Sequence, residues 1–346
     1  MKRKTYISLL IVILILVSLW VLAGWNTNNY DYDNYSRRYG YILDGGFNPL
    51  VLDFGYDFIE YVFGLMGLTY QQFRIWIYGI CLLVIGSLVW KWSIHPIMVL
   101  LFYVCFHFLR DVVETRNFIA SIFILLTLGY YGRSKPKLFI ILLLILLGFS
   151  VHMVFFLYIP FVLIDLKHFH YWWLFVISIV LSFFARNFLG DSLFFLAFEG
   201  LDDKVDRILS DSATFAFIAS ACSALGNGVC ISYFHNKVMK ADLSKISINH
   251  LSVNQYSWVM YNMNALTCLL LILTPINSSF YTRLFGNIVI LNVIYFTNVI
   301  SWVKKDKALM IIMVIVYASY FIVMDNIQPF MEHLNYVLNN NSLLFR

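Results

Sequence analysis

The sequence predicts an all-α, polytopic integral membrane protein with about 11 transmembrane helices, in the range of roughly 10–12, and one re-entrant or interfacial helix. Hydrophobic residues make up 61% of the chain and charged residues 12%, against roughly 45–50% and 25% in soluble domains. Apolar runs of about 20 residues, enough to cross a hydrocarbon layer of roughly 30 Å, recur along all 346 residues. This pattern excludes a soluble globular protein and indicates one membrane-embedded domain, residues 1–346.

The first apolar run, residues 7–25, follows a basic amino terminus. It is either a signal peptide cleaved after Ala23 or a retained first span, and its length favours a retained span. Two later runs on either side of His152 are short, and they form either two spans or one broken helix. The further expected spans are residues 72–90, 94–109, 117–131, 138–150, 153–165, 171–189, 213–234, 255–273, 285–302 and 308–324.

Two sizeable external loops are expected, at residues 26–71 and 190–212. In the first, residues 48–69 are apolar but interrupted by Asp53, Asp57 and Glu60, so we expect a re-entrant or interfacial helix. The i, i+4, i+7 spacing of these carboxylates places them on one helical face. Such a face is costly unless it meets water, a cation or a substrate.

The charged residues indicate an orientation for these spans. With a cytoplasmic amino terminus, every short internal loop carries at least one Lys or Arg, as the positive-inside rule expects. Twelve lysines and two arginines then fall inside, and nine arginines and one lysine fall outside. Because guanidinium binds phosphate or carboxylate bidentately, the outer face is expected to bind an anion, the alternative being that external arginines pair with external carboxylates.

Four arginines are candidates for an anion site at the outer ends of spans. Arg116 lies at the start of an apolar run, where a helix amino terminus offers positive charge and free N–H groups. Arg283 repeats this position, and the two could clamp the two phosphates of a diphosphate. Arg110 and Arg186 are weaker candidates, and Arg110 could instead form a structural i, i+4 pair with Glu114.

The remaining polar candidates could act on a hydroxyl or bind a glycan. His152 could serve as a base or as a donor to phosphate, or it could simply bond a neighbouring helix, and Asp53 is the first choice among the external carboxylates. Tyrosine rings stack on sugars and carboxylates pair with hydroxyls, although tyrosine also collects at membrane interfaces. The glycan-binding candidates are Asp31, Tyr35, Tyr39, Tyr56 and Tyr281.

Several chemistries have no motif in this sequence. The five cysteines fall in apolar segments without a CxxC pair or metal-ligand spacing, so neither a metal site nor a disulfide framework is predicted. HExxH, GxSxG, P-loop and EF-hand patterns do not occur.

In their order along the chain, these motifs resemble the EpsG-type and Wzy-type membrane polysaccharide polymerases. The resemblance covers about residues 26–300. It departs from the family pattern at two places, where Asp53-Phe54-Gly55 stands for Glu-x-Gly and Arg116-Asn117 stands for Arg-Gln. The matching elements are Asp-x-x-x-Tyr at 31–35, acidic-x-Gly-Tyr at 53–56, Tyr-Gln-Gln-Phe at 70–73, Arg-x-x-x-Ala at 116–120, His152 and Arg283.

The resemblance implies polymerisation of oligosaccharide repeat units carried on undecaprenyl diphosphate, giving O-antigen, capsule or exopolysaccharide. The reaction would occur at the outer face of the bacterial cytoplasmic (inner) membrane and would release the lipid diphosphate without a cofactor. Arg116 and Arg283 would receive the departing diphosphate, and His152 or Asp53 would take the proton of the acceptor hydroxyl. The implied partners are the lipid-linked oligosaccharide as donor and acceptor, membrane lipid and a chain-length regulator protein, with no nucleic acid.

Two alternatives use similar residues. An O-antigen ligase or another glycosyltransferase would take the same lipid-linked donor with a different acceptor. A flippase or anion transporter would also place arginines in a membrane cavity, but it should carry charge at midplane depth and often internal repeats. Here the arginines lie at the outer ends of spans, and we find no repeat.

Overall fold

The structure is a computed structural model, in which residues 5–29, 31–49, 53–132, 137–188, 211–241, 243, 246–274, 279–303, 306–324 and 334–344 are described. These residues are largely helical, as predicted, with one antiparallel hairpin formed by β1 (Ser247–Ile248) and β2 (Leu251–Ser252). The helices are α1 (Tyr6–Gly24), α2 (Tyr32–Gly45), α3 (Phe54–Leu65), α4 (Tyr70–Trp92), α5 (Pro96–Phe106), α6 (Phe108–Val113), α7 (Thr115–Thr127), η1 (Leu128–Tyr130), α8 (Leu138–Val151), η2 (Met153–Leu163), α9 (Tyr171–Phe188), α12 (Asp211–Lys240), α13 (Val253–Cys268), η3 (Leu269–Leu273), α14 (Ser279–Trp302) and α15 (Lys307–Met324).

The apolar helices coincide with the predicted spans. In the described part of the chain, five are long and apolar enough to cross a membrane alone: Tyr6–Gly24, Tyr70–Trp92, Phe217–Lys240, Val253–Leu273 and Arg283–Trp302. Shorter apolar helices occupy the other predicted positions, at Pro96–Cys105, Thr115–Tyr130, Leu138–Val151, Met153–Leu163, Tyr171–Phe184 and Lys307–Tyr317. The chain is therefore an all-α, multi-pass membrane protein.

Capping residues determine where some of these helices begin. The Thr69 hydroxyl accepts a hydrogen bond from the Gln72 N–H at 3.3 Å, and the Gln72 side chain accepts one from the Thr69 N–H at 2.9 Å. This reciprocal capping box satisfies backbone donors that the first turn of a helix leaves unpaired. Ser252 and Gln255 form the same box at the start of α13.

α14 lies at the centre of the helical body and is held by asparagines. Asn292 on α14 hydrogen bonds Asn264 on α13 at 2.8 Å and the hydroxyl of Tyr317 on α15 at 2.8 Å. Asn298, also on α14, donates to the Trp92 carbonyl at 2.7 Å. Buried side-chain amides that bond across helices supply specific contacts where lipid and helix surfaces are equally apolar.

The chain reverses direction at His152. α8 ends at Val151, His152 has an extended backbone, and η2 starts at Met153. η2 then packs back along α8, and after it the Asp165 carboxylate accepts a hydrogen bond from the Gly132 N–H, which lies just before α8, at 2.8 Å. The two apolar runs therefore form two antiparallel segments, and the alternative of one broken helix is wrong.

Charged groups separate to the two ends of the body, as the sequence predicts for the two sides of a membrane. At one end Asp53 contacts Arg116 and His152, and Glu114 contacts Arg283. The opposite end holds a second set of contacts, with Asn249 bonded to the Lys91 carbonyl, His250 to the Tyr131 carbonyl and Lys237 to Asp306.

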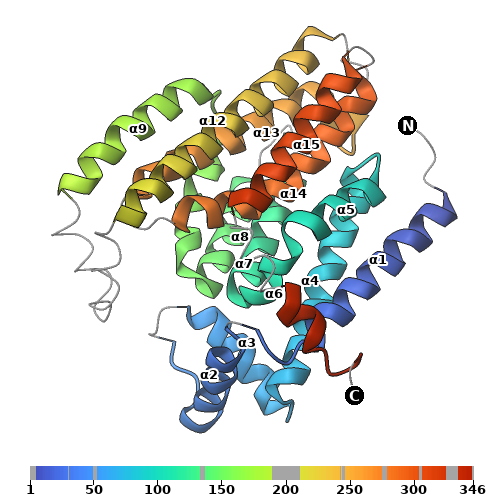
Figure 1. Ribbon diagram of the computed structural model, residues 1–346, viewed down its shortest axis with the longest axis vertical. Helices are drawn as coiled ribbons and strands as arrows, with labels where there is room; N and C mark the ends of the chain where they lie inside the picture. Colours follow the sequence, from blue (N-terminus) through green and yellow to red (C-terminus); the bar gives the residue numbers. More distant parts are fainter. Residues whose placement is uncertain are drawn as a thin grey trace.

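α2 and α3 pack together beside the first of these ends (Figure 1). The sequence predicts a helix within residues 48–69, and α3 confirms this prediction. For the residues that form α2, the sequence predicts only a loop. The carboxylate face of α3 points into the protein: Asp53, Asp57 and Glu60 are all buried. Asp57 pairs with Arg38 of α2. At Asp57 the carboxylate face therefore contacts a cation and not water.

Residues 334–344 lie against the end of α1. The Thr27 N–H donates to the Asn340 carbonyl at 2.8 Å, and the Ser342 N–H donates to the Trp25 carbonyl at 3.0 Å. Asn26 and Asn341 form an isolated antiparallel bridge. The C-terminal segment is thus joined by backbone hydrogen bonds to the residues that follow α1. The predicted loop at 190–212 falls almost wholly outside the described residues.

We expect Gly55→Ala to destabilise the fold, because α3 approaches α8 most closely at this glycine. A Cβ at Gly55 would lie 2.3 Å from the Ser150 Oγ and 2.8 Å from the Ser150 carbonyl carbon. Overpacking of this kind costs about 1–3 kcal/mol. Thermal unfolding of the purified protein measures the effect. Gly40→Ala on α2, where a Cβ would meet nothing within 4 Å, is the control, and equal melting temperatures for the two variants would contradict the close packing.

Candidate active site

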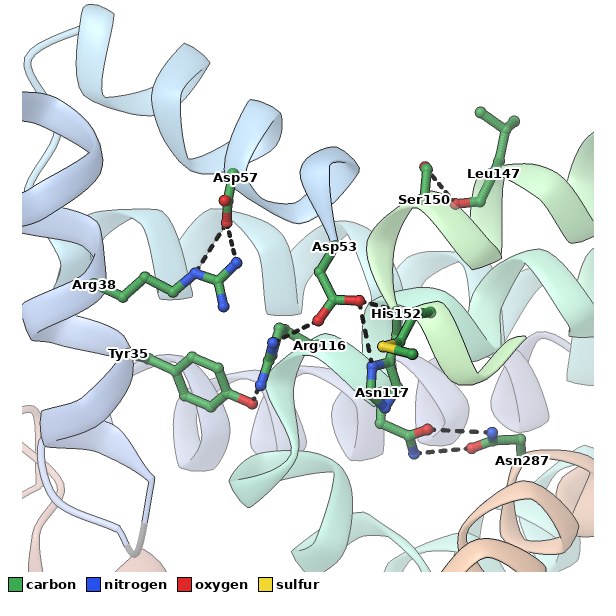
Figure 2. Close-up of polar contacts among 11 residues, drawn as sticks. Tyr35, Arg38, Asp53, Asp57, Arg116, Asn117, Leu147, Ser150, His152 and Asn287 are labelled. Atoms are coloured by element: carbon green, nitrogen blue, oxygen red, sulfur yellow. Dashed lines mark hydrogen bonds and ion pairs between the residues drawn. The ribbon is translucent and has the colours of Figure 1, made fainter. Parts of the chain in front are cut away.

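Asp53 is the residue around which the site is built. It precedes α3 in a left-handed conformation with φ of 64°, one that Asp adopts more readily than most residues. Its Oδ2 accepts a hydrogen bond from Arg116 Nη1 at 2.6 Å, and its Oδ1 accepts one from the Met153 N–H at 2.6 Å. One carboxylate therefore joins the start of α3 to the starts of α7 and η2 (Figure 2).

Arg116 lies in the first turn of α7 and has a second partner on α2. Its Nε donates to the Tyr35 hydroxyl at 3.3 Å, and its guanidinium lies 5.3 Å from the centre of the Tyr35 ring. The side chain keeps 27% of its surface exposed. Arg116 is thus oriented by Asp53 and Tyr35 while part of it remains accessible to a ligand.

His152 lies beside the same carboxylate, at the turn between α8 and η2. Its Nδ1 is 3.8 Å from Asp53 Oδ1, and 16% of the side chain is exposed. Nδ1 is buried and has no hydrogen-bond partner among the described residues. The structure therefore brings together both residues that the sequence nominates for proton transfer.

The surroundings of Asp53 keep it ionised. Burial alone would raise its pKa, but the His152 imidazole, the Arg116 guanidinium and the Met153 N–H together lower the pKa below its ordinary value of 3.8. A carboxylate with a lowered pKa is a weak proton acceptor near neutral pH. Its position is better suited to orienting Arg116 and His152 than to taking a proton itself.

Glu114 joins two further arginines. Its Oε1 lies 3.3 Å from Arg283 Nε, and its Oε2 lies 3.3 Å from Arg110 Nε. Burial would raise the pKa of Glu114, but Arg110 and Arg283 lower it. The predicted i, i+4 pair of Arg110 with Glu114 is confirmed, and the fold adds Arg283, which is 46% exposed.

These two groups of charged residues are neighbours, because Glu114 and Arg116 are separated by one residue. The side-chain amides of Asn117 and Asn287 exchange hydrogen bonds at 3.0 and 3.3 Å and tie α7 to α14 just beyond the arginines (Figure 2). At Gly286 a Cβ would lie 2.9 Å from the His107 ring, so the absence of a side chain permits a close approach. The starts of α7 and α14 are thereby held side by side.

The other predicted site residues are placed as follows. Asp31 lies directly before α2, and the side chain of Arg186, on α9, lies outside those described. Three predicted glycan-binding tyrosines are buried: Tyr39 donates to the Leu68 carbonyl at 2.7 Å, Tyr56 packs on Tyr35, and Tyr281 stacks on Phe285. These three rings have packing partners and present no surface to a glycan; Tyr35, also buried, contacts Arg116.

Sequence reasoning missed the structural role of Arg74. This fully buried side chain donates to the Ala23 carbonyl at 3.2 Å, the Val112 carbonyl at 3.4 Å and the Thr115 hydroxyl at 3.2 Å. It therefore holds the α6–α7 junction, next to Glu114 and Arg116, against α1 and α4. Arg74 lies three residues into an apolar run, a position similar to that of the candidate anion-binding arginines. Only its burial shows that it has a structural role instead.

Comparison with known proteins identifies one relationship. The sequence model of the EpsG family matches residues 9–338, nearly the whole chain. No curated protein and no solved structure matches the chain. No group of three or more His, Cys, Asp or Glu side chains placed to hold a metal ion occurs within the described ranges.

The stability of the protein is expected to depend on pH through Glu60. Burial raises the pKa of Glu60 to about 8 from an ordinary value of 4.5, against the lowering effects of Tyr56 and Arg38. The folded protein then holds a proton that the unfolded chain has lost, so stability falls as the pH rises from about 4.5 to about 8. Glu60→Gln keeps a neutral group there and should flatten this part of the curve.

Thermal unfolding at intervals from about pH 5 to 8 measures this slope. Asp33→Asn, at an exposed position on α2, is the matched control and should leave the slope unchanged. If Glu60→Gln retains the full slope of the unmodified protein, Glu60 is not the residue that titrates.

Proposed function

The chain belongs to the EpsG family, and on this premise we propose that it joins lipid-linked oligosaccharide repeat units into a polysaccharide. The proposed donor and acceptor are oligosaccharides carried on undecaprenyl diphosphate. In this proposal the amino terminus is cytoplasmic, the site faces outward from the bacterial cytoplasmic membrane, and the product is O-antigen, capsule or exopolysaccharide. A chain-length regulator protein is a proposed partner.

One observation supports this proposal above the others: at one end of an apolar helical body, Arg110 and Arg283 share Glu114, and Arg116 shares Asp53 with His152. A diphosphate attached to a membrane lipid lies at the membrane surface and not at its midplane. The arginines lie at helix ends, where such a group can reach them. A transporter would instead need charge along a path through the body.

The proposed reaction assigns a task to each group. The acceptor hydroxyl oxygen attacks the anomeric carbon of the donor, the bond from that carbon to the diphosphate oxygen breaks, and the hydroxyl proton passes to His152. Asp53 faces Nδ1 of His152, so a proton held on Nδ1 would leave Nε2 as the acceptor. Asp53 then orients the base and stays ionised.

The arginines stabilise the leaving group. Negative charge develops on the departing diphosphate, and the cationic donors for it are Arg116, paired with Asp53, and the partly exposed Arg283, paired with Glu114. Glu114 holds Arg110 and Arg283 in place before substrate binds. Preorganised donors do not need to be reoriented during the reaction, which is the source of their catalytic effect.

We expect Arg116→Ala and Arg283→Ala each to remove long polysaccharide chains while membrane insertion is retained. Loss of one transition-state donor typically slows an enzyme by about 10²–10³-fold. The measurement is a gel of surface polysaccharide from a host in which the gene is deleted and then restored as wild type or variant. Arg37→Ala is the matched control, because Arg37 is an exposed external arginine that bonds Asp33 and Asn34 within α2.

The pattern of products separates the candidate functions. Single repeat units that reach the surface without long chains support polymerisation and contradict a flippase. Loss of every surface glycan, single units included, would indicate export or ligation and contradict polymerisation. Chains of normal length from either arginine variant would contradict the proposed diphosphate site.

A further inference from the structure

α3 has its polar face inside and its apolar face outside. Its two charged residues, Asp57 and Glu60, are buried. Phe54, Phe58 and Leu65, by contrast, are 40%, 51% and 70% exposed. A helix surrounded by water would bury the second set and expose the first.

The exposed apolar residues form a stripe together with two partly buried aromatic residues, Tyr61 and Phe47. Phe54, Phe58, Tyr61 and Leu65 follow one another at spacings of four, three and four residues, so they lie along one side of the helix. Phe47, in the segment before α3, extends the stripe, with its ring centre 5.5 Å from that of Phe58 and 6.4 Å from that of Tyr61. Asp57, the charged residue of α3 nearest to this side, is buried and pairs with Arg38.

The stripe adjoins the apolar surface of a membrane helix. Gly55 packs directly against Ser150, in the last turn of α8. α8 exposes Phe139, Leu143, Leu146 and Leu147 along its outer side. In Figure 2, Leu147 points away from the Asp53 carboxylate, while Asp57 points from α3 toward Arg38. The exposed apolar surface of α8 therefore borders the start of α3.

We propose that α3 docks onto the membrane, with Phe54, Phe58 and Leu65 inserted at the boundary between acyl chains and headgroups. The partner is the lipid of the leaflet on the side of the candidate site. Continuity with α8 supports this partner, because lipid that covers an exposed face of α8 also reaches the stripe. The proposal concerns the membrane surface alone and does not depend on the reaction.

The burial of the carboxylates gives the energetic reason for this arrangement. Removing the exposed aromatic and leucine side chains from water is favourable, in proportion to the apolar area that lipid covers. Asp57 and Glu60 lie on the protein side, where Arg38 pairs with Asp57. An apolar stripe that faces lipid and a carboxylate face turned to the protein together allow α3 to lie at the interface without placing a charge in hydrocarbon.

Spin labelling of the full-length protein in lipid vesicles tests this docking. Single cysteines are placed at Phe58 and Leu65, at Leu143 of α8 as a membrane control and at Arg37 of α2 as a water control. The exposed native cysteines, Cys105 and Cys222, are replaced by serine, and residual labelling of the unmodified positions is subtracted. Accessibility to molecular oxygen, which concentrates in lipid, is compared with accessibility to a water-soluble nickel chelate.

We expect oxygen accessibility to exceed nickel accessibility at Phe58 and Leu65, by a smaller ratio than at Leu143, and the reverse at Arg37. A pattern at Phe58 and Leu65 equal to that at Arg37 would place the stripe in water and overturn the proposal. Immobilised labels shielded from both reagents would indicate a second protein surface and would also overturn it. A depth at or beyond that of Leu143 would contradict a position at the boundary.

Discussion

The end of the molecule that carries the candidate site depends on one requirement, that a carboxylate that stays ionised inside an apolar body must be paired. Asp53 meets this requirement with Arg116 on α7 and the Met153 N–H at the start of η2. Removing one partner of such a pair leaves an uncompensated buried charge, which is strongly destabilising. The left-handed backbone at Asp53, the chain reversal at His152 and the orientation of Arg116 toward Tyr35 are all coupled through this carboxylate.

Much of this arrangement could be predicted from the sequence, because two physical signals are local. The lengths of the apolar runs predicted the apolar helices. The positions of Arg116 and Arg283 at the ends of such runs predicted that both lie near helix starts on the same side. Asp53, Arg116 and His152, which the motifs indicate separately as site candidates, lie together in the structure. α2 was not predicted, since its polar, tyrosine-rich sequence lacks an apolar run, and it becomes a helix by packing on α3.

The parts that could not be predicted depend on burial, which the spacing of residues along the chain does not reveal. Tyr39, Tyr56 and Tyr281 match the composition of a glycan-binding loop but lie in the interior. Arg74 has the sequence context of an anion-binding residue, yet it bonds backbone carbonyls. The sequence does not show how Asp53, Glu60 and Glu114 differ in protonation, whereas their surroundings lower the pKa of Asp53 and Glu114 and raise that of Glu60 to about 8. Such divergence is typical of functional sites.

The bridge between Asn26 and Asn341 bears on whether the chain crosses the membrane an odd or an even number of times. α1 is long and apolar enough to span the membrane between Thr5 and Trp25; with this span in place, the Trp25 carbonyl that accepts from the Ser342 N–H lies on the far side. Residues 334–344 therefore lie on the opposite side from Thr5, and the path between them must cross the membrane an odd number of times. The hairpin of α8 and η2 enters and leaves on the same side, so its depth in the bilayer changes the number of crossings only by two.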